Sequence, residues 1–398
     1  MTLTRVCHYT FSTSGGAGRV AEQLSSGLNA IGLPSNVQSL TKGDIKDCLW
    51  EHPILAGQAF FDFFVVRSSY DQSLFSLFRD LEGMKFRREE STIHHLHWMP
   101  GAATVQQIGQ LLRSEMPKVW TLHDMWSFTG GCHHSMDCTG YTNGCLRCPQ
   151  IRRPFSHFVE KSLQLKKENF RQSRNFIAIA PSKWLKNRAQ QSEVFDGGDF
   201  RVIPNPVDTD LFRPGQIQCN LTNDQFIVGC NATNLSDPMK GIDSLIVALE
   251  TFQIKHPDIK VILLAIGSGK IISRKIEIRQ TGFLLDQRQI VLTYSQMDVF
   301  ISMSKAEVFP LSVAEAQSCG LAVICLESGG MPEMIKQAET GFVIASPHEL
   351  STVLDRFIQP ETNRKAMGES ARNYALSNYS TEVVIKKYMD VYESLVLD

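Results

Sequence analysis

The sequence has almost no net charge, and it lacks a long hydrophobic run and any repetitive tract. Its 40 Lys and Arg residues nearly balance 41 Asp and Glu residues, which leaves a formal net charge of −1. Proteins that bind nucleic acid usually carry a basic surface, so this balance gives no support for that class. No apolar run is long enough for a membrane span, and no repeat has solenoid spacing. The first residues enter a predicted strand without the layout of a signal peptide, so we expect a cytoplasmic protein.

The length and the hydrophobic pattern predict two α/β domains. A chain of 398 residues is too long for one typical hydrophobic core. Short apolar runs alternate with helical patterns, which is typical of parallel sheets covered by helices. The predicted strands comprise residues 5–11, 35–40, 92–97, 118–123 and 176–180 in the first half, and residues 226–230, 260–266, 289–293, 299–302 and 322–326 in the second.

A proline-rich segment separates these two sets of strands. Pro204, Pro206 and Pro214 interrupt both helix and strand patterns, which is typical of a connector between domains. We therefore place the first domain at residues 1–205 and the second at residues 206–381. Doubly wound domains bind ligands at the carboxyl ends of their strands. If those ends face each other, a cleft between the domains holds the ligand.

The most informative segment contains Glu307 and Glu315, two carboxylates eight positions apart. Glu307 follows a predicted strand, and Glu315 falls in the first turn of a helix that opens near Ser312. A helix N-terminus suits phosphate, and carboxylates beside it can accept hydrogen bonds from sugar hydroxyls. The segment therefore predicts a nucleotide-sugar site, with donor contacts from Phe309, Pro310, Leu311, Ser312 and Glu315. A second interpretation of Glu315 stays open, because Ser312 and Glu315 also have the spacing of a capping box.

Residues 294–335 resemble the C-terminal signature of the retaining glycosyltransferases of family 4, also called glycosyltransferase group 1. The resemblance rests on Glu307, Phe309, Glu315, Cys319, Gly320, Gly329, Gly330 and Glu333, with Pro310 where many members carry glycine. It implies the GT-B fold, in which two Rossmann-like doubly wound domains enclose a cleft. It also implies that the first domain binds the acceptor, that the second binds the nucleotide-sugar, and that residues 382–398 pack back onto the first domain.

Two further loops have the composition of phosphate-binding segments. Residues 13–19 follow the first predicted strand, and their glycines let backbone N–H groups approach a ligand, although a tight strand–helix turn needs glycine too. Lys240 follows the first strand of the second domain, where an ammonium can offset the charge of a diphosphate; an ordinary surface lysine is the alternative. By resemblance, Gly16 would contact the donor diphosphate and Lys240 would match the family's lysine. Asn234 occupies the position of the family's arginine, which leaves the diphosphate with one cation fewer.

Two histidines end neighbouring strands of the first domain. His123 ends a buried strand at the edge where such domains bind ligands, although an isolated buried histidine is usually a core residue. The segment around His123, Leu-His-Asp, resembles a family motif. That resemblance implies that His123 hydrogen-bonds a hydroxyl of the donor sugar. His97 ends the strand before it, and we expect it near the same edge in a supporting or acceptor-side role.

Four of the ten cysteines fall close together, at Cys132, Cys138, Cys145 and Cys148. The last pair has the tight spacing of a zinc knuckle, whereas the spacing of the first pair is looser. In a cytoplasmic protein such a cluster binds metal more often than it forms disulfides. Structural zinc, a disulfide and free thiols are therefore three open interpretations.

Two stretches of the first domain combine aromatic and basic side chains. Residues 60–67 and 85–88 form the first stretch. Residues 152–174 form the second and include Lys166, Lys167 and Arg171. Such a surface could hold the protein at an anionic membrane. A buried helix and a solvated helix face are the alternative interpretation of these patterns, and the more common one.

These features and the resemblance predict a retaining hexosyltransferase that uses a nucleoside diphosphate-sugar, with UDP or GDP as the nucleotide. Catalytic roles fall to Glu307, His123 and Lys240. The acceptor would be a hydroxyl of a glycan or lipid-linked molecule in polysaccharide, lipopolysaccharide or glycolipid synthesis, at the inner face of the membrane. The resemblance implies front-face attack that needs no cofactor. A nucleotide-sugar epimerase of GT-B fold and a non-enzymatic sugar-nucleotide-binding protein are the alternatives.

Overall fold

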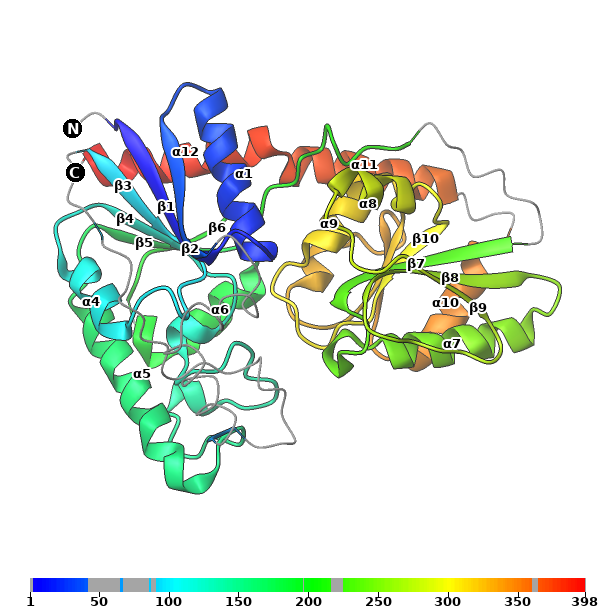
Figure 1. Cartoon of the computed structure of the whole chain (residues 1–398), viewed down its shortest axis with the longest axis horizontal. Coiled ribbons are helices and arrows are strands. Elements are labelled where there is room, and N and C mark those ends of the chain that lie inside the picture. The colour runs from blue at the N-terminus through cyan, green and yellow to red at the C-terminus, as the bar shows by residue number, and fades with distance from the viewer. Residues whose placement is uncertain are drawn as a thin grey trace. The chain divides into compact units, whose positions relative to one another are not determined.

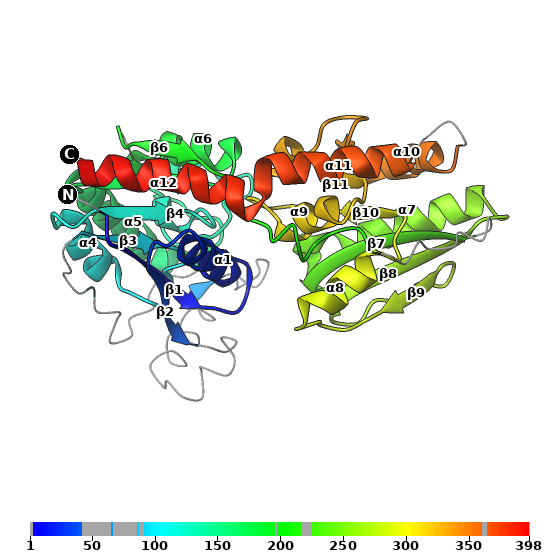
Figure 2. The same ribbon diagram turned by 90° about the horizontal axis from the view of Figure 1, so that it is seen from above.

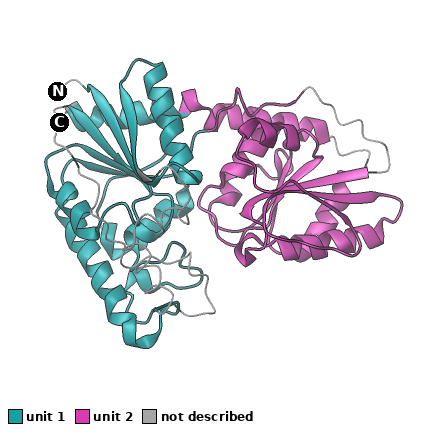
Figure 3. Cartoon of the chain, viewed as in Figure 1, with its two compact units in different colours: residues 1–206, 384–398 teal, residues 207–383 magenta. Residues whose placement is uncertain are grey.

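The protein is described from a computed structural model of the whole chain. The described residues are 3–41, 65–66, 86, 91–195, 197–215, 225–359 and 364–397. The chain divides into two compact units (Figures 1 and 3). Unit 1 comprises Met1–Pro206 and Val384–Asp398, and unit 2 comprises Val207–Val383.

Unit 1 is built on a six-stranded parallel sheet. Its strands are β1 (Arg5–Ser12), β2 (Ser35–Thr41), β3 (Thr92–Leu96), β4 (Lys118–Thr121), β5 (Phe176–Ala180) and β6 (Phe200–Val202). The helices described in it are α1 (Gly16–Ala30), α4 (Val105–Arg113), α5 (Ser156–Arg171), α6 (Lys183–Gln191) and most of α12 (Thr381–Leu397). The strand order is β2-β1-β3-β4-β5-β6, and neighbouring strands run parallel. Parallel neighbours need crossover connections, which the helices provide.

Unit 2 repeats this architecture with a sheet of its own. Its strands are β7 (Gln225–Asn234), β8 (Lys260–Ser268), β9 (Glu277–Gln280), β10 (Val299–Ser302), β11 (Val323–Leu326) and β12 (Gly341–Ile344). The helices are α7 (Ile242–Lys255), α8 (Gln287–Tyr294), α9 (Leu311–Ser318), α10 (Leu350–Phe357) and α11 (Arg364–Tyr379). The order is β12-β11-β10-β7-β8-β9, again with parallel neighbours.

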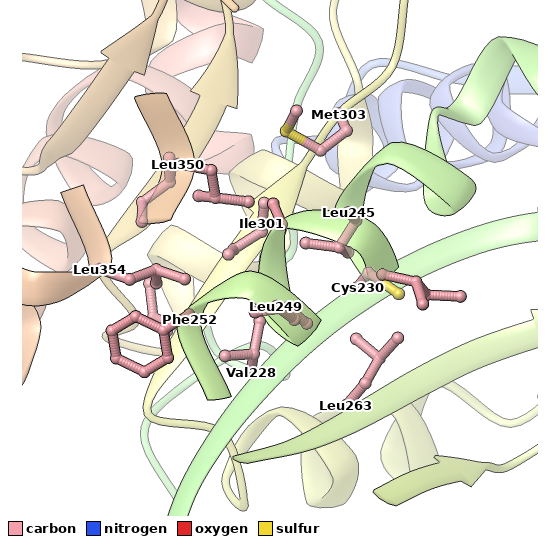
Figure 4. Packing of buried hydrophobic residues seen from close by; sticks show 14 of the residues in the cluster. Val228, Cys230, Leu245, Leu249, Phe252, Leu263, Ile301, Met303, Leu350 and Leu354 are labelled. Atoms are coloured by element: carbon pink, nitrogen blue, oxygen red, sulfur yellow. The ribbon is translucent and has the colours of Figure 1, made fainter. Parts of the chain in front are cut away.

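The sheet of unit 2 is buried on both faces. On one face Val228 of β7 packs in a cluster with Leu249 of α7 and Leu354 of α10 (Figure 4). On the other face Phe300 of β10 belongs to a cluster with Val313 of α9. Strands covered on both sides are nearly continuous apolar runs rather than alternating patterns. This double burial explains why β7, β8 and β10 are recognisable in the sequence.

Helix α12 follows unit 2 in the sequence but packs on the sheet of unit 1 from Val384 onwards (Figure 2). Tyr388 and Tyr392 are fully buried there. The Tyr392 hydroxyl lies 2.7 Å from His95 Nδ1, and the Tyr388 hydroxyl lies 2.8 Å from the Thr121 hydroxyl. The last helix therefore completes the polar interior of unit 1.

The predicted α/β architecture is confirmed, but one predicted strand is wrong. Residues 289–293 lie in helix α8, where the Asp286 carboxylate accepts the Arg288 N–H and caps the N-terminus. A short apolar run does not distinguish a buried strand from a buried helix turn, and the cap decides here. The strands β6, β9 and β12 are absent from the predicted set. In β6 and β9 most residues are half-buried or exposed, so these strands lack the continuous apolar run that marks a buried strand.

We expect Tyr392→Phe to lower the free energy of unfolding by about 1–3 kcal/mol, because it leaves the buried His95 Nδ1 without this hydrogen bond. The matched control is Tyr374→Phe in unit 2, whose hydroxyl donates to the Glu333 carbonyl oxygen at a more exposed site. Urea unfolding followed by circular dichroism measures both variants. Equal, small losses in the two variants would contradict a stabilising role for Tyr392.

Candidate functional site

The strand order of unit 2 reverses between β7 and β10. Strands β8 and β9 extend the sheet to one side of this pair, and β11 and β12 extend it to the other. Doubly wound sheets bind ligands at the carboxyl ends of the strands beside such a reversal. Lys240 lies in the loop after β7, and Glu307 lies in the loop after β10. The topology thus brings together two residues, distant in sequence, that are predicted to act on the donor.

Lys240 and Glu307 form an ion pair. Lys240 Nζ lies 2.7 Å from Glu307 Oε1, and the Ser304 hydroxyl donates to the same oxygen at 2.9 Å. The two charged side chains are 32% and 20% exposed, so a ligand can still reach them. Burial by itself would lower the pKa of Lys240, but Glu307 and, to a smaller extent, Asp237 raise it above its ordinary value. Lys240 is therefore protonated at neutral pH. Glu307 has a structural partner that the sequence does not reveal.

Backbone contacts hold the two loops together. Gly241 has a φ of +66°, and a Cβ there would lie 2.2 Å from the Met303 carbonyl oxygen. The Lys305 N–H donates to the Met239 carbonyl oxygen at 2.8 Å. The glycine after Lys240 is thus required both by its left-handed backbone and by the close approach of the β10 loop.

The Gly329-Gly330 pair performs a similar task on the other side of Glu307. A Cβ at Gly329 would lie 1.8 Å from the Glu307 carbonyl oxygen. The Gly330 N–H donates to that oxygen at 2.9 Å. The glycine pair therefore orients the Glu307 backbone, which gives the motif a physical reason that sequence spacing alone does not supply.

Helix α9 begins at Leu311, and no side chain caps its N-terminus. The capping box of Ser312 and Glu315 is therefore not formed. Glu315 lies in the second turn, not the first as predicted, and it is 2% exposed. The Tyr294 hydroxyl lies 3.4 Å from Glu315 Oε2, and the Asn231 amide donates to that hydroxyl at 2.8 Å. Glu315 thus belongs to a buried polar network below the positive end of the α9 dipole.

The remaining residues predicted to contact the donor differ in exposure. Phe309 is 8% exposed, and its ring packs edge to face on Tyr379 at 5.1 Å, so it belongs to the core of unit 2. Pro310 is buried, whereas Leu311 and Ser312 are half-buried at the start of α9. Asn234 is exposed at the end of β7, and its side-chain oxygen accepts the Ser236 N–H at 3.1 Å. Their contacts with a donor stay predictions.

The strand order of unit 1 reverses between β1 and β3. The glycine-rich loop follows β1, and helix α1 begins at the exposed Gly16. Gly15 has a φ of +86°, and a Cβ at Gly18 would lie 2.4 Å from the Ser12 carbonyl oxygen. Gly15 and Gly18 therefore shape the turn and seat the helix, while Gly16 is placed at the helix N-terminus, where an anion is favoured.

A row of histidines crosses the sheet of unit 1 and ends at His123. His8 Nδ1 lies 2.9 Å from His97 Nε2, and His97 Nδ1 lies 3.0 Å from His123 Nε2. His95 stacks on His97 at 4.3 Å and uses both ring nitrogens, toward Tyr392 and Thr121. Only His123 and His97 are prominent in the sequence. The contribution of His8 depends on β1 pairing with β3, which no local pattern indicates.

Burial keeps these histidines neutral. It lowers the pKa of His8 to about 3 and that of His123 to about 4, in the latter case against the opposing effect of Asp124. Burial, reinforced by the neighbouring histidines, also holds the pKa values of His95 and His97 well below the ordinary range. In a neutral chain the hydrogen bonds run in one direction, because each ring has one donor and one acceptor. The tautomer of His123 is therefore coupled to that of His97 and His8.

Asp124 connects this edge of the sheet to the segment that follows. Its carboxylate accepts hydrogen bonds from Trp98 Nε1 at 2.7 Å and from the Trp126 N–H at 2.8 Å, and lies 2.6 Å from His133 Nδ1. Burial opposes ionisation of Asp124, but His133 and the Trp126 N–H together hold its pKa below the ordinary value. His133 stands next to Cys132, so the cysteine-containing segment is fastened directly to the His123 edge.

The four clustered cysteines border one cavity of unit 1, together with Tyr141 and Val159. All four are free thiols, so the disulfide interpretation does not describe this structure. Cys132 and Cys145 are buried, and Cys138 and Cys148 are half-buried. Burial is the main cause that raises the pKa of Cys148 to about 11.

The basic stretch at residues 152–174 is not one exposed face. Lys166 is 3% exposed, and its ammonium donates to the Trp126 and Thr129 carbonyl oxygens at 2.5 and 2.9 Å. The predicted surface role of Lys166 is therefore wrong, because this side chain is enclosed by the segment after β4. Of the aromatic stretches at 60–67 and 85–88, only residues 65, 66 and 86 lie inside the described residues. In the whole part of the chain that the structure describes, no helix combines the length and the apolar character that crossing a membrane requires.

Comparison with known proteins connects unit 2 to a family. Residues 233–374 match the family described as glycosyl transferases group 1, a span that includes Lys240, Glu307 and Glu315. The glycosyl transferase WcaC of Escherichia coli K12, named for colanic acid biosynthesis, is 23% identical over 353 residues, 82% of each chain. A GDP-mannose-dependent mannosyltransferase of Corynebacterium glutamicum, named for a phosphatidylinositol monomannoside, is 28% identical over 219 residues, 49% of this chain and 56% of its own. The chain is therefore related to the group 1 glycosyltransferases.

Solved structures agree on the fold. Sucrose-phosphate synthase from Thermosynechococcus elongatus aligns with a TM-score of 0.65 at 17% identity and covers 99% of both chains. Anabaena HepE in complex with UDP aligns with a TM-score of 0.61 at 16% identity, over 98% of this chain and 100% of its own. At such identities the likeness defines the fold alone, and that fold is GT-B, as the sequence resemblance implies.

The histidine row predicts a pH response. We expect the ring signals of His8 and His123 in nuclear magnetic resonance spectra to stay those of neutral imidazole down to about pH 4. In the unfolded chain the same groups bind protons near pH 6.5, so their contribution to stability is complete above pH 6.5 and is lost as the pH falls toward 4. The urea-unfolded protein is the control. A His123 signal that titrates above pH 6 in the folded protein would contradict the buried, neutral network.

Proposed function

We propose that the protein is a retaining hexosyltransferase that uses a nucleoside diphosphate-sugar. The observation that carries this proposal is the Lys240–Glu307 pair at the strand-order reversal of unit 2. A cation and a carboxylate at that edge suit a ligand that combines a diphosphate with sugar hydroxyls. The match of residues 233–374 to the group 1 glycosyltransferases supports the same chemistry.

In the proposed mechanism Lys240 stabilises the departing diphosphate. An ammonium held in place before the reaction lowers the energy of the developing negative charge without reorganisation. The N-terminus of α9 at Leu311 contributes its dipole to the same phosphate. A bound diphosphate would compete with Glu307 for the Lys240 ammonium. The Glu307 carboxylate could then accept hydrogen bonds from the sugar instead.

The family resemblance supports an assignment of residues to the sugar and to the ribose. We assign Glu307 to hydroxyls of the transferred hexose and Glu315 to the ribose, with Tyr294 and Asn231 as its partners. His123 donates to or accepts from a sugar hydroxyl in the tautomer that His97 sets. In the retaining pathway the acceptor oxygen attacks on the face that the leaving phosphate occupies, and a phosphate oxygen takes its proton. Proton nuclear magnetic resonance of the fresh product tests retention; an inverted anomeric configuration would exclude this pathway.

We propose a sugar hydroxyl of a growing glycan or a lipid-linked glycan as the acceptor, and UDP or GDP as the donor nucleotide. UDP is bound by the structural neighbour HepE. GDP-mannose is named in the Corynebacterium relative. Thermal-shift measurements with UDP, GDP and other nucleoside diphosphates separate these alternatives, because only a ligand that binds the folded state raises the melting temperature.

Removing the charged pair should affect turnover more than folding. We expect Lys240→Ala to slow transfer on the order of a hundredfold, because one charge-assisted donor is worth roughly 3 kcal/mol at the leaving group. Glu307→Gln should also remove most turnover, since it neutralises the carboxylate that Lys240 and Ser304 hold in place. Initial rates of nucleotide release in the presence of acceptor measure both.

The matched control is Lys365→Ala, which removes an exposed lysine from helix α11 of the same unit. Circular dichroism establishes that each variant is folded. A folded Lys240→Ala variant within threefold of the wild-type rate would show that another group offsets the diphosphate charge.

We also propose peripheral contact with an anionic membrane through the exposed Arg152 and Arg153 before helix α5, where Phe155 and Phe158 stack. Replacing both arginines with Gln should reduce sedimentation with anionic vesicles at low salt, because charge attraction to the surface is lost. The control replaces the exposed Lys270 and Lys365 of unit 2 with Gln. Equal recovery of the wild-type protein in the supernatant with anionic and neutral vesicles would exclude the contact.

A further inference from the structure

The segment between β4 and α5 of unit 1 has few regular elements, yet many of its residues are buried around one cavity. Four thiols, from Cys132, Cys138, Cys145 and Cys148, line that cavity. The regular elements that the structure describes between β4 and α5 are short single-turn helices, such as Gly140–Thr142. We propose that this cavity is a structural zinc site with the four cysteines as its ligands. Four soft thiolates around one point favour tetrahedral Zn²⁺ over the harder cations.

A hydrogen bond to sulfur supports this assignment. The Gly140 N–H donates to Cys138 Sγ at 3.3 Å. The donor comes from two residues further along the chain. Such N–H groups stabilise a thiolate, and outer contacts of this kind orient metal ligands.

A buried cation lies beside the cysteines. The Lys166 ammonium donates to the carbonyl oxygens of Trp126 and Thr129, and it is close enough to Cys132 and Cys145 for their charges to interact. A zinc ion bound by four thiolates carries a net charge of about −2. Burying a lone ammonium is costly, and a nearby anion of this charge offsets part of that cost. Zinc would therefore add to the contacts with the Trp126 and Thr129 carbonyl oxygens that hold Lys166 in place.

The distances require the thiols to close in when metal binds. Within the described residues the group of three ligand atoms that lie within 4.8 Å of one another is His8, His95 and His97, not the cysteines. Both ring nitrogens of His95 are already hydrogen-bonded, so that group is a polar core rather than a ligand set. A cysteine sulfur moves by roughly 3 Å between staggered rotamers. Zinc binding therefore requires the cysteine side chains to rotate until their sulfurs reach the zinc–sulfur distance of about 2.3 Å.

Zinc would stiffen the segment that leaves the His123 edge. His133 lies beside Cys132, and its ring is held by Asp124, the neighbour of His123. The site is separate from the chemistry proposed for unit 2, and it stands or falls independently of that function. Its role is positional, because four protein ligands leave no open position for a substrate.

The test is the metal content of the full-length protein, purified without a metal-binding tag and dialysed against metal-free buffer. We expect about one zinc per chain by elemental analysis, and below about 0.2 in the Cys145→Ser/Cys148→Ser variant. The matched control is Cys319→Ala, which removes a buried thiol from unit 2 and should keep about one zinc. Wild-type protein with less than about 0.2 zinc per chain, or with another metal in its place, would overturn the proposal.

A second measurement covers the case in which the double variant does not fold. In folded wild-type protein we expect about four additional thiols to react with a thiol reagent after a chelator removes the metal. Loading with Co²⁺ should then produce the thiolate-to-metal absorption of a tetrahedral site. An unchanged thiol count after chelation, or disulfides found by mass spectrometry of the untreated chain, would refute zinc ligation.

Discussion

The close approach of the β7 and β10 loops is the constraint on which the candidate site of unit 2 depends. The two strands are neighbours at the point where the strand order reverses, so their loops leave the sheet in opposite directions and would separate. A left-handed Gly241 and the bond from the Lys305 N–H to the Met239 carbonyl oxygen keep them in contact. That contact sets Lys240 beside Glu307, and the Gly329-Gly330 pair holds the Glu307 backbone from the far side.

Unit 1 depends on a different constraint: its buried histidines must stay uncharged. His8, His95 and His97 are at most 1% exposed, and each has a ring or hydroxyl partner. Neutral imidazoles cost less to bury than imidazolium ions, and hydrogen bonds from Tyr392 and Thr121 satisfy His95. The last helix is therefore required for the polar interior of the sheet that it covers, although it belongs to the other end of the chain. This arrangement places a rigid, neutral His123 at the edge of the sheet.

Much of the fold and part of the site were predictable from residue patterns. Strands such as β7 and β10 are buried on both faces, so they appear as continuous apolar runs. Lys240, Glu307 and His123 were predictable because each ends such a run or lies in the loop that follows it. Lys166 and residues 289–293 were not. The first has the spacing of a solvated basic helix, and its burial depends on the cysteine-containing segment above it. The second is a short apolar run whose helix is decided by the Asp286 cap.

The sequence by itself determined the two α/β domains, the loops that carry the charged and glycine residues, and the family that residues 233–374 resemble. Local pattern suffices for these, because strand burial, turn chemistry and motif spacing are properties of neighbouring residues. Only the tertiary structure decided that Glu307 pairs with Lys240, that Glu315 joins Tyr294 and that His8 extends the row to His123. Those partners are set by strand order and register, which bring together side chains separated by 21 to 89 positions. No sequence period encodes such a distance, so the partnerships exist only once the sheets have formed.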